Sequence, residues 1–340
     1  MRLPFSPNMF KFALLWLIFG VFFGLNIRYG SVSIPFGEVW AHLLGQSANT
    51  QSPFYQIIWN IRLPDALQTA LAGAGLSVSG LWMQTFFRNP IAGSYILGIS
   101  SGASLGIAVA LLAFPAFLGV FGMWGASISA FAGAALMLGL VLWINYRLPD
   151  KNTLLLVGVL LGTGISAGVE LLQFFAPPDK LQQYVLWTMG SLAGAVWAEV
   201  ILLGGLVIGA LIAGYLLSSG LNLLLLGDDY ASSSGLALRR FKTYLILLTA
   251  LLSGSITAFC GLIALVGTAV PQLARWMFST SQHQILTPAC GLLGACMLLI
   301  CAYLCKLPFA DQALPINAVT SILFAPVIVW ILLKQKSGKV

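Results

Sequence analysis

Charged residues are scarce in this chain: they make up 7% of its 340 residues, whereas hydrophobic residues make up 59%. Soluble domains carry roughly 25% charged residues, so this composition excludes a soluble globular protein. The long hydrophobic runs leave no room for a sizeable domain outside a membrane. The net charge of +7 is therefore not an indication of a nucleic-acid partner, and lipid is the expected surrounding.

Residues suited to catalysis or metal binding are also few. The chain has two histidines, and its five cysteines form no CxxC pair and lie in apolar C-terminal segments, as small packing residues do. No phosphate-binding GxxxxGK[ST] loop, HExxH motif or paired acids with catalytic spacing is present. We therefore expect no enzymatic activity in this chain and no cofactor or metal bound by it.

The hydrophobic runs predict an all-α, polytopic membrane protein with about ten transmembrane helices in a single domain, residues 1–340. With the N-terminus in the cytoplasm, twelve Lys and Arg residues fall on the cytoplasmic side and four on the outer side, as the positive-inside rule requires. Both termini are then cytoplasmic. A retained first helix is favoured over a cleaved signal peptide because no small-x-small site follows it. The predicted spans are 12–27, 63–87, 91–113, 120–145, 153–176, 196–218, 242–261, 263–280, 286–305 and 315–334.

The second predicted span is rich in small residues and lies between Arg62 and Arg88, with Asp65 as its one charge. Small residues allow neighbouring helices to approach closely in a membrane. This span is therefore predicted to pack against other parts of the protein.

Three connections between spans are long enough to hold structure. An outer connection, 28–61, is predicted to contain a short interfacial helix near 36–44, and 177–195 is predicted to form a second outer helix. The longest cytoplasmic connection, 219–242, carries Asp228 and Asp229 where the first turn of a short helix would favour acids. From these residues alone, a solvated loop and a docking element for a cytoplasmic partner are about equally favoured.

Glu170 is the one carboxylate well inside a predicted span, and such acids are candidates for ion or proton coupling. This offers an alternative function, an ion-coupled secondary transporter. Glu170 has no evident basic partner in the sequence, so a polar contact between helices is favoured over coupling.

Four groups of motifs, in order along the chain, are similar to those of the FecCD family, the permease subunits of type II ABC importers for iron chelates, haem and cobalamin. The resemblance covers nearly the whole chain. The motifs are RLP at 62–64 with FRNP at 87–90 and LGISSGA at 97–103, then LGDDYASSSG at 226–235, GLIALVGTAVPQLAR at 261–275, and LPI at 314–316 with Pro326 and Trp330.

The resemblance implies a homodimer in the bacterial inner membrane, with ten helices per subunit around one central pathway. Two cytoplasmic ATPase subunits, which use the ATP, would dock on the connection 219–242 as a coupling loop, and an outer substrate-binding protein would deliver a metal chelate. A ferric siderophore is our first choice of substrate, with haem and cobalamin close behind. The small-residue face of span 63–87 is then a candidate wall of the pathway.

The resemblance also assigns candidate site residues. Docking of the binding protein is expected at Arg62 and Lys306. The cytoplasmic gate is expected at Lys151, Asn152 and Thr153. The residues expected to couple to the ATPase are Gly227, Asp228, Asp229, Ala231 and Gly235.

Five positions depart from the family pattern. Asp65 replaces a basic residue, which puts part of the outer docking surface in question. Lys306 keeps the charge of the usual arginine but loses its forked geometry. The others are Leu262 for proline, Gln272 for histidine and Ala302 for aspartate.

Overall fold

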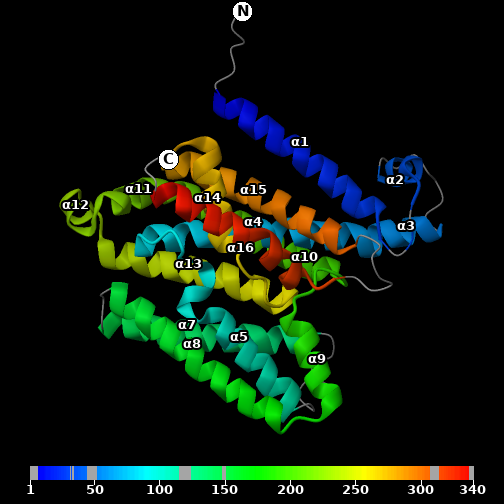
Figure 1. The fold of residues 1–340 in the computed structure, drawn as a ribbon, viewed down its shortest axis with the longest axis horizontal. Coiled ribbons are helices and arrows are strands. Elements are labelled where there is room, and N and C mark those ends of the chain that lie inside the picture. The colour runs from blue at the N-terminus through cyan, green and yellow to red at the C-terminus, as the bar shows by residue number, and fades with distance from the viewer. Residues whose placement is uncertain are drawn as a thin grey trace, which may run out of the picture.

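The structure is a computed structural model that describes residues 7–30, 32, 34–43, 52–114, 124–147, 151–306 and 314–336, in which helices are the only regular elements. Most of the long helices run along the long axis of the molecule (Figure 1). The elements are α1 (Pro7–Arg28), α2 (Phe36–Leu43), α3 (Pro53–Ile57), η1 (Ile58–Arg62), α4 (Leu63–Phe87), η2 (Ser94–Leu97), α5 (Ile99–Ala108), η3 (Val109–Ala113), α7 (Gly125–Arg147), α8 (Lys151–Phe174), α9 (Pro178–Thr188), α10 (Trp197–Leu216), α11 (Ser218–Leu226), α12 (Asp228–Ser233), α13 (Leu238–Cys260), α14 (Val266–Phe278), α15 (His283–Cys305) and α16 (Ile316–Lys336).

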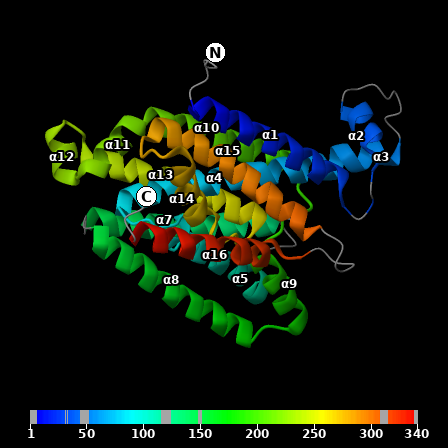
Figure 2. The same ribbon diagram turned by 45° about the horizontal axis from the view of Figure 1, so that its top comes forward.

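The molecule has two distinct ends along this axis (Figure 2). The α12 end carries α12, and α1 begins and α16 finishes toward it, whereas α2, α3 and α9 lie at the opposite, α9 end. The helices α2 and α9 confirm the two short helices predicted in the outer connections. Termini toward one end agree with an even number of crossings, while the orientation in the membrane stays a prediction.

Helix α4 is the centre of the packing. Of its 25 residues, 21 are buried, and it contacts α15, α13, α14, α10 and α1. At one such close approach, a Cβ added to Gly73 would lie 2.3 Å from the carbonyl oxygen of Gly294 in α15. The predicted close packing is therefore confirmed. The expectation that the small-residue face forms a pathway wall is wrong, because that face is filled by neighbouring helices of the same chain.

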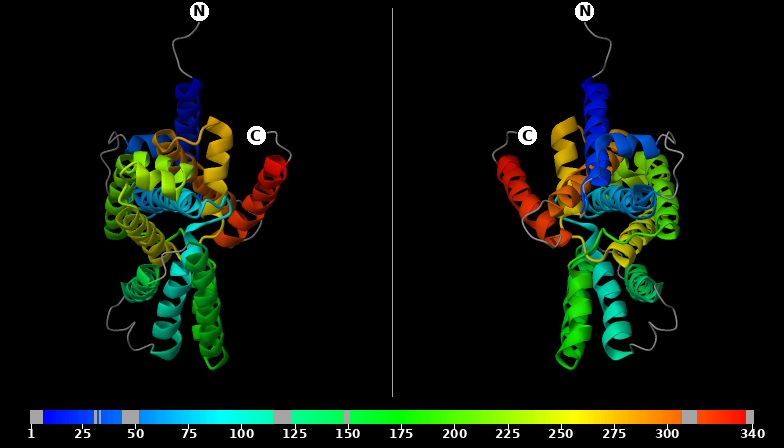
Figure 3. Two further views of the ribbon diagram at one scale, coloured as in Figure 1. Left: turned by 90° about the vertical axis from the view of Figure 1, so that its left-hand side faces the viewer. Right: turned by 90° about the vertical axis from the view of Figure 1, so that its right-hand side faces the viewer.

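Helices α5, α7 and α8 form a second group on one side of α4. Helix α13 contacts both α4 and α7, and α5 packs against α7 and α8. Seen along the long axis of the molecule (Figure 3), α5 and α8 extend away from the other helices. This arrangement leaves much of the apolar surface of α8 exposed, including Leu160 and Leu171.

Each of the ten predicted spans corresponds to a helix, but the count of ten crossings is not established. By length and composition, six helices among the described residues are able to cross a membrane: α1, α7, α8, α10, α13 and α15. Helix α4 is long enough but carries polar Gln, Thr and Ser side chains. Helix α14 has 13 residues, fewer than the roughly 20 that a full crossing needs.

The break between α13 and α14 falls where the sequence placed it. Helix α13 ends at Cys260, and Gly261 follows with φ +71°. The chain then turns through Leu265, which also has a positive φ, before α14 begins at Val266. A nearly continuous apolar sequence is thus divided by backbone geometry.

Candidate coupling site at the α12 end

Within the connection 219–242, the short helix α12 lies between the longer helices α11 and α13. Helix α11 ends at Leu226, Gly227 reverses the chain, and α12 follows with Asp228 and Asp229 in its first turn. The φ of Gly227 is +131°, a conformation that other residues rarely adopt. The short helix that the sequence predicted is confirmed, and we call α12 the coupling helix.

The coupling helix is closed at its C-terminus by a Schellman motif. The Leu236 N–H donates to the Ala231 carbonyl at 3.0 Å, and Gly235 between them has φ +86°. Ala231 is fully buried and anchors the coupling helix on the main core. Gly235 and Ala231 thus fix the shape of this segment, whereas their part in ATPase coupling stays a prediction.

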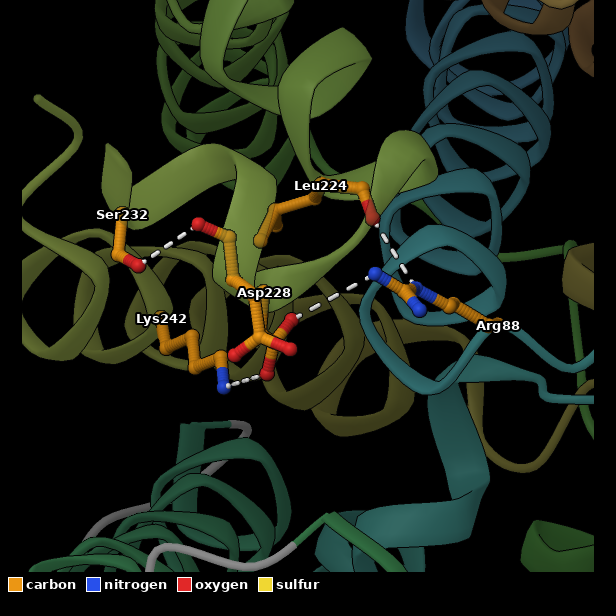
Figure 4. A network of polar contacts seen from close by, with 6 residues as sticks. Arg88, Leu224, Asp228, Ser232 and Lys242 are labelled. Carbon is orange, nitrogen blue, oxygen red and sulfur yellow. Dashed lines mark hydrogen bonds and ion pairs between the residues drawn. The ribbon is translucent and has the colours of Figure 1, made fainter. Parts of the chain in front are cut away.

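The two acids of the coupling helix face different surroundings. Lys242 Nζ donates to Asp228 Oδ2 at 2.7 Å, and Arg88 Nη2 lies 3.8 Å from Asp228 Oδ1 (Figure 4). Asp229 is exposed, and its backbone carbonyl accepts a hydrogen bond from Ser232 Oγ at 2.9 Å. Asp228 therefore belongs to the packing of the loop, and Asp229 to its outer surface.

An exposed surface surrounds Asp229 at the tip of this end. Leu226 is 66% exposed and Tyr230 is 53% exposed. We call Leu226, Asp229 and Tyr230 the docking face. A large aliphatic side chain, a tyrosine and a carboxylate together are suited to contact with another protein, because aromatic and apolar residues contribute most to interface cores.

Arg88 was not among the predicted site residues, although it lies in the FRNP motif. It ends α4 in a left-handed conformation, with φ +50°, which costs a non-glycine residue roughly 1–2 kcal/mol. Its side chain reaches the coupling segment, where Nε donates to the Leu224 carbonyl at 3.1 Å. The sequence signal was present as a basic residue at a helix end, but its partners lie far along the chain.

Beneath the coupling segment, a buried polar network joins α4 to α14. Gln84 Oε1 accepts hydrogen bonds from Gln272 Nε2 at 2.9 Å and from Arg275 Nη1 at 2.5 Å. Gln272 Nε2 also donates to the Pro90 carbonyl at 3.0 Å. The glutamine at position 272, where the family usually has histidine, is thus accommodated by two acceptors.

A second buried contact joins α11 to α4 and α15. The ring of His283 is fully buried, with Nε2 2.8 Å from Thr85 Oγ1 and Nδ1 2.8 Å from Asn222 Oδ1. The backbone N–H of His283 donates to the same Asn222 oxygen at 3.0 Å. The helix that leads into the coupling helix is therefore held by side chains as well as by apolar packing.

The predicted outer docking residues lie together at the α9 end, and both contact the end of α1. Arg62 is only 6% exposed, and its guanidinium donates to the carbonyls of Ile27, at 2.8 Å, and of Arg28 and Val32. Cations at a helix C-terminus satisfy carbonyls that have no partner within the helix. Arg62 thus has a structural role that the sequence did not indicate, and its docking role stays a prediction.

Lys306 follows α15 and reaches the same helix end. Its Nζ donates to the Asn26 carbonyl at 3.2 Å and lies 3.1 Å from Asn26 Oδ1. Burial lowers the pKa of the Lys306 ammonium, and the nearby Asp65 carboxylate opposes this by raising it. Lys306 and Arg62 together hold α1 against the bundle.

Asp65, the main departure from the family pattern, has a specific partner. Its Oδ1 accepts a hydrogen bond from the Ala195 N–H at 2.9 Å, in the connection between α9 and α10. Asp65 is buried, at 8% exposure, so this carboxylate fixes the connection to the start of α4. A basic residue at this position would have no acceptor to offer the same N–H.

The remaining candidate residues lie on α8. Lys151, Asn152 and Thr153 form its first turn, and the side chains of the first two lie outside the described part of the structure. Their role as a gate stays a prediction. Glu170 is exposed near the other end of α8, so nothing in its surroundings favours the ion-coupled alternative.

The cysteines and the other metal-ligating residues form no site in the described part of the chain. All five cysteines are buried and free, and no group of three His, Cys, Asp or Glu side chains among the described residues is placed to hold a metal ion.

Comparison with known proteins places the chain in a family. The sequence matches the FecCD transport family over residues 16–334. It is 34% identical over 318 residues to the hemin transport system permease protein HmuU of Yersinia pestis, with 92% of each chain covered. It is 35% identical over 312 residues to the vitamin B12 import system permease protein BtuC of Klebsiella pneumoniae, with 92% of this chain and 90% of that protein covered. The chain belongs to the FecCD transport family.

The fold is similar to that of a solved relative. A metal-chelate type ABC transporter in an inward-facing conformation superposes with a TM-score of 0.80 at 28% sequence identity. The match covers 94% of this chain and 97% of that one. The resemblance inferred from the motifs is therefore confirmed over the whole fold.

Proposed function

We propose that this chain is the permease subunit of an ATP-driven importer that carries a metal chelate across the bacterial inner membrane. Membership of the FecCD transport family supports a transport component, and the related structure is that of a metal-chelate type ABC transporter. The observation that carries the proposal most directly is the coupling helix. It presents Asp229 and Tyr230 outward while Asp228 ties it to the membrane helices.

The proposed assembly has three kinds of partner. Two copies of this chain form the pathway, and two ATPase subunits bind one docking face each and hydrolyse the ATP. A substrate-binding protein docks at the α9 end. The exposed apolar surface of α8 and α16, including Leu160 and Ile322, supports contact with a second copy or with lipid.

The substrate is proposed as a class, a bulky metal chelate. HmuU is named for hemin transport and BtuC for vitamin B12 import, which supports haem or cobalamin. A ferric siderophore, the first choice from the sequence, stays a prediction. These compounds share a large, planar or globular metal complex, so a pathway of apolar side chains would discriminate weakly among them.

Reconstitution tests the proposal. The chain is purified with its cognate ATPase and binding protein and placed in proteoliposomes. Uptake of labelled ferric siderophore, haem and cobalamin is then measured with ATP or with a non-hydrolysable analogue inside the vesicles. We expect uptake of one of the three that requires hydrolysable ATP and both partner proteins.

Two results would overturn the proposal. Uptake that continues without ATP and collapses with the ion gradient would identify a secondary transporter, and Glu170→Gln should then abolish it. ATP-dependent transport that runs outward would show an exporter. If all three chelates fail while another compound is imported with ATP, the substrate class is wrong and the importer assignment stands.

A further inference from the structure

Four helices, the coupling helix among them, meet at one set of polar contacts (Figure 4). Arg88 ends α4, the Leu224 carbonyl belongs to α11, Asp228 begins α12 and Lys242 lies in the first turns of α13. We call these four groups the Arg88 clamp. They connect the coupling helix to the central helix of the fold on one side and to the next long helix on the other.

Arg88 makes two different contacts with the coupling segment. Its Nε donates to the Leu224 carbonyl at 3.1 Å, and its Nη2 lies 3.8 Å from Asp228 Oδ1. Leu224 is in the last turn of α11, where carbonyls lack partners within the helix. One side chain therefore joins the end of one helix to the start of the next, across the reversal at Gly227.

The backbone at Gly227 lies close to the guanidinium of Arg88. A Cβ added at Gly227 would lie 3.2 Å from Arg88 Nη2, and its φ of +131° disfavours other residues. The backbone of the reversal thus lies directly against the Arg88 side chain. Glycine is therefore favoured at position 227 for a second reason besides its φ, because a larger side chain would push the guanidinium away from Asp228.

The backbone of Arg88 indicates that its side chain is needed there. The φ of +50° is in the left-handed region, where glycine or asparagine would be less strained at the end of a helix. The hydrogen bond from the Asn89 N–H to the Gln84 carbonyl, at 3.1 Å, stabilises this strained conformation. A neutral glycine would close α4 as well, but it would leave the Leu224 carbonyl and Asp228 without the cation.

We propose that Arg88 is the positioning residue that makes the coupling helix and α4 move as one unit. The inference rests on the proposed function, since it requires an ATPase acting on the coupling helix. Displacement of α12 would be passed through Arg88 to α4 and, because α4 contacts seven other α-helices, to the centre of the bundle. Lys242 carries the same displacement to α13 through Asp228.

The clamp differs from the docking face in position and consequence. Arg88 is 41% exposed and Asp228 34%, and both are turned toward the membrane helices rather than to the tip of the loop. Removing Arg88 should therefore leave ATPase binding in place and disconnect it from transport. A residue of the docking face would instead lose the ATPase itself.

The experiment compares Arg88→Gln with wild type in the reconstituted complex with its ATPase and binding protein. ATPase affinity, ATP hydrolysis and substrate uptake are measured together. We expect ATPase affinity within about twofold of wild type, continued hydrolysis, and at least a tenfold loss of substrate carried per ATP hydrolysed. Arg88→Lys should recover only part of this ratio, because an ammonium cannot reach Leu224 and Asp228 with one fixed fork.

Asp228→Asn supplies an independent route to the same state. It weakens the contacts of residue 228 with both Arg88 and Lys242 without changing α4. Its loss of transport per ATP should therefore be at least that of Arg88→Gln, and the double variant should lose less than the product of the two single losses. Arg240→Gln is the matched control, since Arg240 is an exposed cation of α13 beside the clamp. Thermal unfolding of each purified variant verifies that it is folded.

Each outcome bears on the inference separately from the proposed function. Unchanged transport per ATP in Arg88→Gln, with an active wild-type complex, overturns the inference alone. Loss of ATPase affinity in step with transport also overturns it, because Arg88 would then shape the docking face. Should wild type show no ATP-dependent uptake, the inference and the proposed function fall together.

Discussion

At the residue scale, the different surroundings of the two acids in the coupling helix determine what each substitution does. Asp228 is held by Lys242 and Arg88, whereas Asp229 is exposed beside Tyr230. We predict that Asp229→Lys lowers affinity for the ATPase roughly three- to tenfold, mainly by slowing association, because exposed interface charges act on encounter more than on contact energy. Binding kinetics of the purified ATPase at low and high salt measure the change.

Asp179→Lys is the control for that prediction. Asp179 is an exposed acid in the first turn of α9, at the opposite end of the molecule. The Asp179→Lys substitution changes the net charge by the same amount without altering the docking face. An equal loss in both variants would show a general charge effect and contradict a specific role for Asp229.

Gly235 is the other residue whose replacement has a defined consequence. Its φ of +86° is incompatible with proline, and its N–H donates to the Ser232 carbonyl at 3.0 Å. Gly235→Pro should unwind the end of the coupling helix and reduce ATPase co-purification by roughly tenfold or more, while Gly235→Ala costs about 1–2 kcal/mol and has a milder effect. Co-purification and limited proteolysis of the connection measure both.

Ser234→Ala is the control for the Gly235 variants, because it tests whether any substitution in this connection reduces ATPase co-purification. Ser234 is exposed and has φ −80°, which alanine adopts without strain. We expect wild-type co-purification for this variant. A Gly235→Pro protein that retains its ATPase would show that the Schellman closure is not needed for docking.

At the element scale, the packing of α4 against α15 is sensitive to side-chain size. A Cβ at Gly73 would lie 2.3 Å from the Gly294 carbonyl and 2.9 Å from Leu298 Cβ. Gly73→Ala should force the two helices apart and lower stability by about 1–3 kcal/mol. Thermal unfolding in detergent measures this, with Gly205→Ala on α10, where a Cβ meets nothing within 4 Å, as the control. Equal midpoints for the two variants would contradict the close contact.

The sequence predicted the positions of the helices better than it predicted which helices pack against each other. Hydrophobic runs located every long helix, but α5 begins at Ile99 and not at residue 91, because a 3₁₀ turn and Gly98 with φ +70° intervene. The small residues of α4 predicted close packing without telling what packs there. Either a pathway wall or a neighbouring helix satisfies the same composition, and only tertiary contacts distinguish the two.

At the scale of the whole molecule, the sequence predicted the short helix α12 but not the surroundings of its two acids. Asp228 and Asp229 are adjacent and chemically identical, and nothing local tells which one faces inward. That depends on Arg88, whose hydrogen bond to Leu224 joins residues 136 positions apart. The motifs nevertheless predicted the family, because a motif match uses only the sequence and needs no knowledge of these contacts.

The α9 end shows the same limit and offers the last test. Outer basic residues were predicted to dock a binding protein, yet Arg62 and Lys306 both bind carbonyls at the end of α1. We predict that Arg62→Ala lowers the thermal midpoint of the isolated chain, because each hydrogen bond from a charged group contributes about 1.5–3 kcal/mol. Lys306→Glu should slow capture of the binding protein at low salt, with the difference shrinking at high salt.

Measuring both properties on both variants separates the two roles. Arg28→Gln, at a half-buried position in the last turn of α1, controls for loss of one positive charge at this end. If Arg62→Ala leaves the thermal midpoint unchanged but slows capture, Arg62 docks the partner, and its carbonyl contacts add little to stability. If the midpoint falls while capture by the folded fraction is normal, Arg62 holds α1 in place, and the binding protein must recognise other groups at the α9 end.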